Sequence, residues 1–133
     1  MKEMVYQKES KIEVLDTGTC LGFFYWILNL GTHPTAYVKI PESHKYYQKH
    51  YDDIDIQAHG GLTYSRDYLW ISENQKLEGW FIGWDYAHCY DYAGYYTQRD
   101  TTLCELKKWT TEEIRKEVYE VCEQLLKGRV WNK

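Results

Sequence analysis

The sequence contains little proline, no long apolar run and no excess of positive charge. Two prolines occur among 133 residues, and the longest apolar stretch, residues 21–30, is interrupted by Asn29. A stretch of this length is too short for a helix that spans a bilayer. Residues 1–10 are charged throughout and lack the apolar core of a signal peptide. We therefore expect no membrane partner.

Basic residues are too few for a protein that follows a nucleic-acid backbone. The chain has 16 Lys and Arg against 20 Asp and Glu, for a formal net charge of −4. Binding to a polynucleotide needs a basic surface that displaces counterions, so we expect no polynucleotide partner. A small nucleotide is still compatible, because one phosphate cluster needs only a few donors.

Cysteine and named catalytic motifs are also sparse. The four cysteines show no CxxC spacing, which disfavours a zinc knuckle or a disulfide framework and predicts reduced thiols in a cytoplasmic protein. The sequence contains no GxSxG, P-loop, GxGxxG or HExxH motif. No cofactor is required by any motif, and the oligomeric state stays open.

Aromatic residues, by contrast, are abundant. Six Trp, fourteen Tyr and three Phe make up 17% of the chain. Tyr and Trp combine a large apolar ring with a polar group, so they suit both half-buried core positions and wet binding surfaces. Most of these rings are expected in the core, and some are expected to line a pocket.

The apolar patterns predict one α+β domain over residues 1–133, with a mainly antiparallel β-sheet and one C-terminal amphipathic α-helix packed on a face. Residues 21–30 are typical of a central strand buried on both faces, and they are expected to form a hairpin with the next strand. A turn is predicted at residues 16–18 and a polar loop at residues 73–79. The predicted strands are residues 11–16, 21–30, 35–40, 52–59 and 79–86.

The C-terminal helix has the clearest signals. Thr110 and Glu113 form the spacing of a capping box, and Gly128 is a typical helix stop. A helix of about 17 residues with one apolar stripe is therefore expected between them. The stripe consists of Ile114, Val118, Val121, Cys122 and Leu125.

Two segments concentrate polar side chains that do chemistry. If residues 52–59 form a strand, Asp53, Asp55 and His59 project from one face, and Gly60 and Gly61 let a ligand approach the backbone closely.

In the second segment, Asp85, His88 and Asp91 are spaced by three and line up if the chain turns helically after its strand. Asp85 lies between Trp84 and Tyr86, so a buried carboxylate here would need a partner. The candidate partners are His59, His88 and Arg66.

This combination of imidazoles and carboxylates suits a divalent metal, acid–base chemistry near neutral pH, or a solvated surface. The candidate ligand-binding residues are Asp53, Asp55, His59, Gly60, Gly61, Tyr64, Trp84, Asp85, His88 and Asp91. The candidate catalytic residues are Asp55, His59, Asp85 and His88. The candidate ligands for a divalent metal are His59, Asp85 and His88.

The runs YDDIDIQAHGGLTYS (residues 51–65) and GWFIGWDYAHCYD (residues 79–91) resemble a family of small uncharacterised proteins from phages, prophages and some bacteria. That family shares a YDDxDxxxHGGLTY segment and a G[FW]DxAHxxD segment. The resemblance implies a phage or prophage origin, a location in the host cytoplasm, and a functional role for the motif histidines, aspartates and glycines.

Three functions follow from these features. The first is small-molecule binding, as in a phage counter-defence protein that sequesters a nucleotide-type signal in a cleft of His, Asp and aromatic residues. The second is a small metal-dependent or acid–base hydrolase that uses the same cluster. The third is an inhibitor that binds a host protein through an aromatic face. No complete catalytic set emerges from the spacings, which favours binding.

Overall fold

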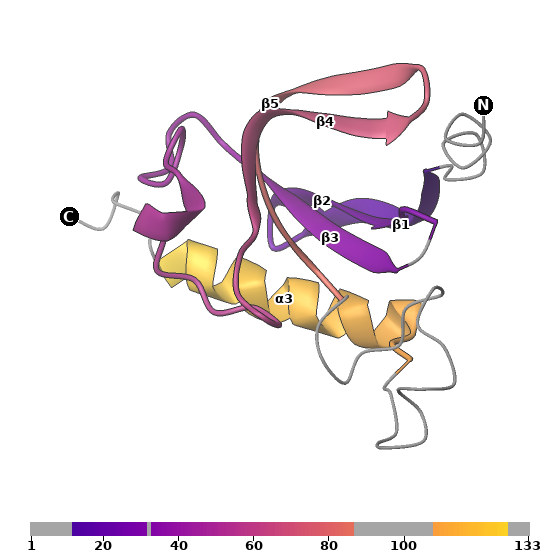
Figure 1. Cartoon of the computed structure of the whole chain (residues 1–133). Coiled ribbons are helices and arrows are strands. Elements are labelled where there is room, and N and C mark those ends of the chain that lie inside the picture. Colours follow the sequence, from indigo (N-terminus) through magenta and orange to yellow (C-terminus); the bar gives the residue numbers. More distant parts are fainter. Residues whose placement is uncertain (1–11, 32, 87–107, 128–133) are drawn as a thin grey trace.

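The protein folds as a five-stranded antiparallel sheet with one long helix against a face (Figure 1). The computed structural model describes residues 12–31, 33–86 and 108–127. The strand order is β1-β2-β3-β5-β4. The elements are β1 (Glu13–Cys20), β2 (Phe23–Asn29), β3 (Pro34–Ile40), the short 3₁₀ helix η1 (Tyr51–Asp53), β4 (Tyr64–Ser72), β5 (Gln75–Asp85) and α3 (Thr111–Lys127). The α+β fold class expected from the sequence is therefore confirmed.

The predicted hairpin between residues 21–30 and 35–40 is present as β2 and β3, which pair antiparallel. β2 lies inside the sheet, between β1 and β3. Burial on both faces holds for Ile27 and Leu28 but not for Phe24, which is 55% exposed. The expectation of a strand buried throughout is thus wrong at its beginning.

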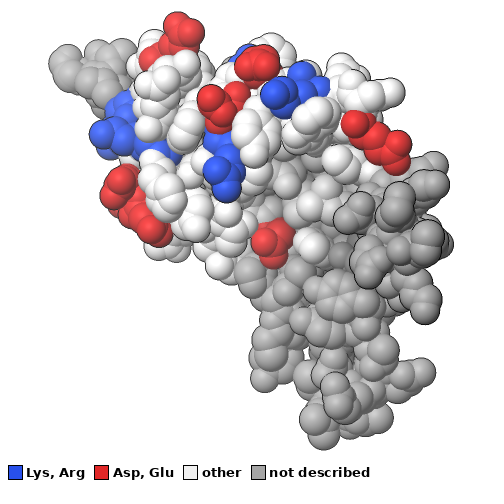
Figure 2. Space-filling view, turned by 45° about the horizontal axis from the view of Figure 1, so that its top comes forward, with Lys and Arg blue, Asp and Glu red and all other residues white. Residues whose placement is uncertain are grey.

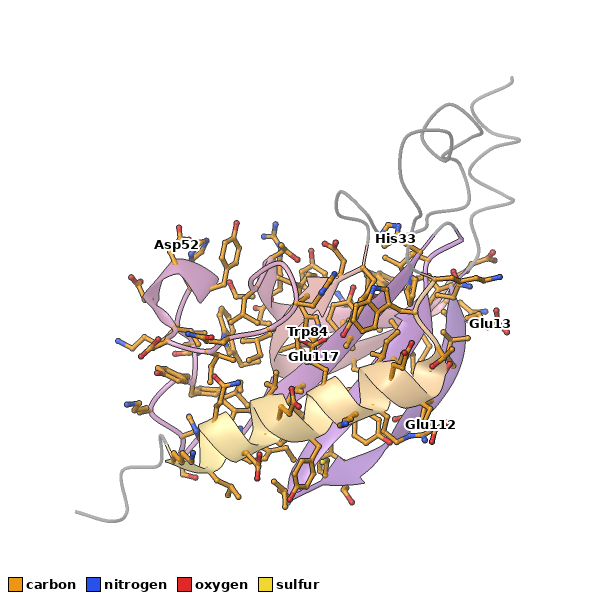
Figure 3. The ribbon with its side chains drawn as sticks, turned by 90° about the horizontal axis from the view of Figure 1, so that it is seen from below. Glu13, His33, Asp52, Trp84, Glu112 and Glu117 are labelled. Atoms are coloured by element: carbon orange, nitrogen blue, oxygen red, sulfur yellow. The ribbon has the colours of Figure 1, made fainter. Side chains whose placement is uncertain are left out.

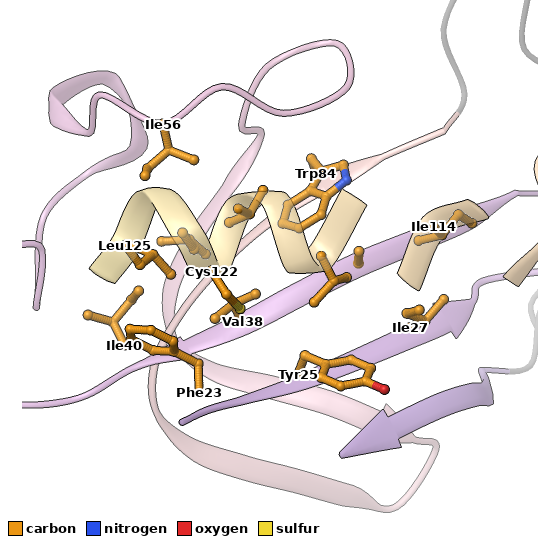
Figure 4. Close-up of a cluster of buried hydrophobic side chains, with 14 of the residues drawn as sticks. Phe23, Tyr25, Ile27, Val38, Ile40, Ile56, Trp84, Ile114, Cys122 and Leu125 are labelled. Carbon is orange, nitrogen blue, oxygen red and sulfur yellow. The ribbon is translucent and has the colours of Figure 1, made fainter. Parts of the chain in front are cut away.

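Helix α3 begins with the predicted capping box. The backbone N–H of Glu113 donates to Thr110 Oγ1 (3.1 Å), and the backbone N–H of Thr110 donates to Glu113 Oε1 (3.0 Å). The whole predicted apolar stripe is buried against the sheet. Figure 4 shows the facing side chains, among them Phe23, Tyr25, Ile27, Val38, Ile40, Ile114, Cys122 and Leu125.

A second, smaller apolar cluster lies on the other side of the sheet. Its buried members are Leu28, Tyr37, Leu69 and Phe81. The two edge strands, β1 and β4, contact each other, so the sheet curls around this cluster. Tyr37 lies directly over Gly83, where an added Cβ would come within 2.4 Å of the Tyr37 ring. Because Gly83 has no side chain, the ring of Tyr37 can pack directly against the backbone of β5.

The predicted strand over residues 52–59 is wrong. Residues 51–53 form η1, and residues 54–63 belong to no strand. The alternating burial nevertheless holds, since Ile54 and Ile56 are 7% and 8% exposed. Asp53 and Asp55 are therefore not in a row on a strand face with His59. The side-chain amide of Gln124 takes the place of a strand partner: the Gln57 N–H donates to its Oε1 (2.7 Å), and its Nε2 donates to the Gln57 carbonyl (2.9 Å).

Two turn and loop predictions are also wrong. Residues 16–18 belong to β1, because Thr17 and Gly18 pair with Trp26 and Tyr25 of β2. Residues 73–79 are a loop only at Glu73 and Asn74, since β5 already begins at Gln75. The partner strand β4 is not among the predicted strands. The β4–β5 hairpin is rich in exposed polar residues, and such a sequence is hard to distinguish from that of a loop.

Candidate functional site

The two sequence segments singled out above meet at the end of β5. The backbone N–H of Thr63 donates to the Gly83 carbonyl (2.9 Å), and the Thr63 hydroxyl donates to Asp85 Oδ2 (3.2 Å). Four residues earlier in the same loop, the imidazole of His59 stacks on the ring of Tyr86. The loop between η1 and β4 is therefore held against β5 through both backbone and side chains.

His59 lies on the helix side of this junction. Its ring also meets Trp109 edge-on, with centroids 4.9 Å apart. Beside it runs an open groove of about 580 Å³ between the loop and α3. The groove is lined by Asp55, Gln57, Ala58, His59, Glu117, Glu120 and Gln124. Three carboxyl side chains and no Lys or Arg line this groove, which disfavours an anionic ligand there.

A chain of hydrogen bonds lies beneath His59. Trp84 Nε1 donates to the Tyr86 hydroxyl (3.0 Å), which in turn donates to Glu117 Oε1. Figure 3 shows Trp84 close to Glu117, which projects from α3. Trp84 is only 1% exposed, and its N–H is used within the protein. Its ring therefore belongs to the core, and its predicted role as a ligand-binding residue stays a prediction.

Asp85 projects to the opposite side of β5 from Trp84, into a separate cavity of about 170 Å³. The cavity is lined by Leu30, His33, Thr35, Tyr37, Thr63, Tyr64, Trp84 and Asp85. One carboxyl-bearing and four hydroxyl-bearing residues thus line a small, partly open cavity. We call it the Asp85 cavity.

The two phenols of the Asp85 cavity are neutral at ordinary pH. Burial raises the pKa of Tyr37, and the charge of Asp85 adds to the rise while Thr35 opposes it. Burial likewise raises the pKa of Tyr64, and the neighbouring phenols of Tyr37 and Tyr68 raise it further. The Tyr64 hydroxyl donates to the Tyr68 carbonyl (2.5 Å), which fixes its direction.

Thr35 is the most deeply buried polar residue of the cavity wall, at 3% exposed. The Thr35 hydroxyl lies near enough to Tyr37 to oppose the rise in the pKa of that phenol. Thr35 Oγ1 nevertheless forms no hydrogen bond of normal geometry with any described residue. Buried hydroxyls are nearly always hydrogen-bonded, because losing water without a replacement partner is costly. This wall of the cavity therefore has unused hydrogen-bonding capacity.

The other predicted site residues are dispersed. Asp53 is an exposed residue of η1, and Asp55 is exposed on the groove beside His59. Gly60 and Gly61 have φ angles of 69° and 88°, so glycine is needed for the tight turn they form. His88 and Asp91 lie outside the described residues.

The expected cluster of His59 with Asp85 does not form among the described residues, because the two side chains line different cavities. Across residues 12–31, 33–86 and 108–127, no group of three His, Cys, Asp or Glu side chains is arranged to hold a metal ion. Thr63, which was not among the expected partners of Asp85, donates a hydrogen bond to it.

Several residues of the site were missed at the sequence level. Thr63 lies within the HGGLTY run, so its position next to predicted site residues could have identified it. Thr35 and Tyr37 belong to an ordinary strand pattern, and Glu117 is one of many acids on the polar side of the helix. Nothing local distinguishes these three residues.

The surface gives no sign of a basic stripe on the face that Figure 2 shows, where acidic and basic side chains are interspersed. The exposed large rings lie on different elements, with Phe24 on β2, Trp70 on β4 and Tyr119 on α3. In the described part of the chain, every helix is too short or too polar to cross a membrane.

The fold and the site define a small α+β protein with an acidic groove on the helix side of its sheet and a hydroxyl-lined cavity on the other. Comparisons with protein-family models, curated proteins and solved structures found no match. The resemblance to phage and prophage proteins therefore stays a prediction.

Proposed function

We propose that this protein binds a small molecule rich in hydrogen-bond donors, and that the Asp85 cavity receives one polar group of it. The observation that carries the proposal is the composition of the cavity wall: Asp85 and four hydroxyl-bearing residues, Thr35, Tyr37, Thr63 and Tyr64, line one cavity.

The chemistry of the wall defines the group that would enter. A carboxylate accepts several hydrogen bonds, and the Thr63 hydroxyl donates one to Asp85. A sugar diol or the N–H edge of a base carries donors that a carboxylate accepts. Neither Lys nor Arg lines the cavity, so a phosphate group would be poorly stabilised there.

The size of the cavity limits how much of the ligand is enclosed. A volume of about 170 Å³ corresponds to several water molecules at roughly 30 Å³ each. Typical pockets for whole ligands are larger, at about 300–1,000 Å³. A nucleotide-type ligand would therefore insert its base or its sugar and leave its phosphates outside.

Sequestration of a nucleotide-type signal during phage counter-defence is the biological role we propose for this binding. It rests on the resemblance of the two motif segments to phage and prophage proteins. Binding is favoured over hydrolysis because His59 and Asp85, two of the proposed catalytic residues, line different cavities.

Isothermal titration calorimetry with a panel of nucleosides, nucleoside monophosphates and inorganic phosphate tests the proposal. We expect at least one nucleoside to bind, and inorganic phosphate alone not to bind. Asp85→Asn should weaken binding at least tenfold, whereas Asp55→Asn, a matched control beside His59, should bind as the wild type does. Equal affinity in the wild type and Asp85→Asn would overturn the assignment of this cavity.

A further inference from the structure

Two cysteines approach each other between the end of β1 and the C-terminal half of α3. Cys122 belongs to the buried stripe of α3, and Cys20 is partly buried and packs against the same apolar cluster. Cys20 is also the β1 partner of Phe23 on β2. Paired residues of neighbouring strands project from the same face of a sheet, so the Cys20 side chain points toward the helix, as that of Phe23 does.

Two contacts establish how α3 runs relative to β1. Near the start of the helix, Arg115 Nε donates to Asp16 Oδ2 of β1 (2.7 Å). Near its end, the ring of His44 meets Phe23 edge-on, and His44 Nε2 lies 2.8 Å from the Leu125 carbonyl oxygen. Because Phe23 pairs with the last residue of β1, the strand and the helix run in the same direction, and they pack against each other.

The spacing along the two elements brings the two thiols to the same level. From Asp16 to Cys20, four steps along a strand cover roughly 13 Å. From Arg115 to Cys122, seven steps along a helix cover about 10 Å. Figure 4 shows the Cys122 side chain pointing from α3 toward the sheet. Burial raises the pKa of Cys122, and the neighbouring thiol of Cys20 raises it further. The two sulfurs are therefore neighbours.

The two thiols differ in how easily a reagent reaches them. Cys20 is partly exposed and is followed by the exposed residues Leu21 and Gly22 of the β1–β2 turn. Cys122 is completely buried. An accessible thiol can exchange with a disulfide from solution, whereas a buried, protonated thiol reacts only with a sulfur that is brought next to it. Cys20 is therefore placed to react first and Cys122 second.

From this arrangement we propose that Cys20 is a site of thiol modification, which Cys122 converts into a disulfide between β1 and α3. The oxidant is a low-molecular-weight disulfide such as glutathione disulfide. This modification goes beyond the proposed function, because it uses none of the residues of the Asp85 cavity.

The reaction proceeds by two exchanges. The Cys20 thiolate attacks one sulfur of glutathione disulfide, whose S–S bond breaks, so a mixed disulfide forms and one glutathione thiolate leaves. Cys122 then gives up its proton and attacks Cys20 Sγ, which forms the internal S–S bond and releases the second glutathione thiolate. The two thiol protons end on the two released glutathione molecules, and two electrons pass from the protein to glutathione.

The disulfide would change the stability of the fold. It would close a loop that contains most of the chain, and a cross-link over a long loop restricts the unfolded chain strongly. Oxidation would therefore hold α3 against the sheet, and reduction would remove this restraint.

Mass spectrometry after treatment with glutathione disulfide tests the proposal. The full chain carries Cys89→Ser and Cys104→Ser, which remove the two cysteines outside the described residues. We expect its intact mass to fall by the mass of two hydrogen atoms, and its digest to contain two peptides joined through Cys20 and Cys122. With Cys122→Ser added, one glutathione should remain on Cys20. With Cys20→Ser added instead, Cys122 should remain unmodified.

Thermal unfolding of the oxidised and the reduced chain measures the consequence. We expect oxidation to raise Tm by at least about 5 °C, dithiothreitol to reverse the rise, and the oxidant to leave the Tm of the Cys20→Ser variant unchanged. A chain that keeps both thiols free or retains glutathione, a disulfide that joins two chains, or an unchanged Tm on oxidation would overturn the proposal.

Discussion

The imidazole of His59 lies flat against the ring of Tyr86, with ring centroids 4.7 Å apart and planes 9° apart. Tyr86 is itself held by hydrogen bonds with Trp84 and Glu117. The stack therefore connects the loop after η1 to a fixed point of the core. Thr63, which follows four residues later in that loop, is positioned to donate to Asp85.

Removing the imidazole should loosen this loop. We expect His59→Ala to lower the free energy of unfolding by about 0.5–1.5 kcal/mol, the usual contribution of a stacked ring pair. His59→Phe keeps a flat ring and should retain most of that stability. Urea unfolding followed by circular dichroism measures both variants. Equal losses in the two variants would show that stacking is not what the loop depends on.

Glu117 should contribute more than a surface acid does. It accepts the hydrogen bond of the buried Tyr86 hydroxyl, and bonds to charged groups contribute about 1.5–3 kcal/mol. Because the amide oxygen of Gln still accepts this bond, we expect Glu117→Gln to lower the free energy of unfolding by about 1 kcal/mol, the difference between a charged and a neutral hydrogen bond. Glu120→Gln, on the exposed part of the same helix, should change it little. Chemical denaturation of both variants makes the comparison, and indistinguishable midpoints would contradict the role of Glu117.

Stability should fall in acid because of the contact between β1 and α3. Asp16 Oδ2 accepts hydrogen bonds from Arg115 Nε (2.7 Å) and the Tyr25 hydroxyl (2.8 Å). Partial burial alone would raise the pKa of Asp16, but the hydrogen bonds and charge of Arg115 and the bond from Tyr25 outweigh it. The pKa therefore lies below its ordinary value.

A carboxyl group whose pKa is lower in the folded state stabilises the fold above its unfolded pKa of about 3.9, and this contribution is lost as the pH falls through the folded pKa. We expect the wild type to be more stable than Asp16→Asn near neutral pH and this advantage to disappear in strong acid. Thermal unfolding of both proteins across a pH series measures it. An advantage independent of pH would exclude the ionised Asp16 as its source.

His44 should exist as one neutral tautomer. Its Nε2 lies 2.8 Å from the Leu125 carbonyl, which can only accept, and its Nδ1 accepts from the Tyr46 backbone N–H (3.0 Å). The proton must therefore be on Nε2. We expect the ¹⁵N shifts of the ring to show that tautomer, and His44→Ala to cost about 1–3 kcal/mol for two lost hydrogen bonds. A proton on Nδ1 would contradict this arrangement.

The elements that the sequence predicts best are those with local signals. The capping box at Thr110 and Glu113 marks the start of α3, and the 3.6-residue repeat gives its buried stripe. The β2–β3 hairpin follows from two apolar runs separated by a Gly- and Pro-containing loop. Such signals depend only on neighbouring residues, so no knowledge of tertiary contacts is needed.

The site depends on contacts between distant residues, and this is where the sequence predictions fail. Alternation in residues 52–59 indicates a strand, but the partner of Gln57 is a side chain 67 residues away. The juxtaposition of Thr63 with Asp85 depends on how β4 and β5 pair, and this pairing contains irregularities of register. The side chains of Trp84 and Asp85 lie on opposite faces of the sheet, because adjacent residues of a strand point to opposite sides.

Native mass spectrometry after incubation with a mixture of nucleosides tests the central claim most directly, because it detects the bound species and, after denaturation, its released mass. Binding at the Asp85 cavity predicts one nucleoside per wild-type chain, released with its mass unchanged, and little or no retention by Asp85→Asn. A wild-type protein that retains no nucleoside, an Asp85→Asn variant that retains as much, or a released product of altered mass would contradict the account.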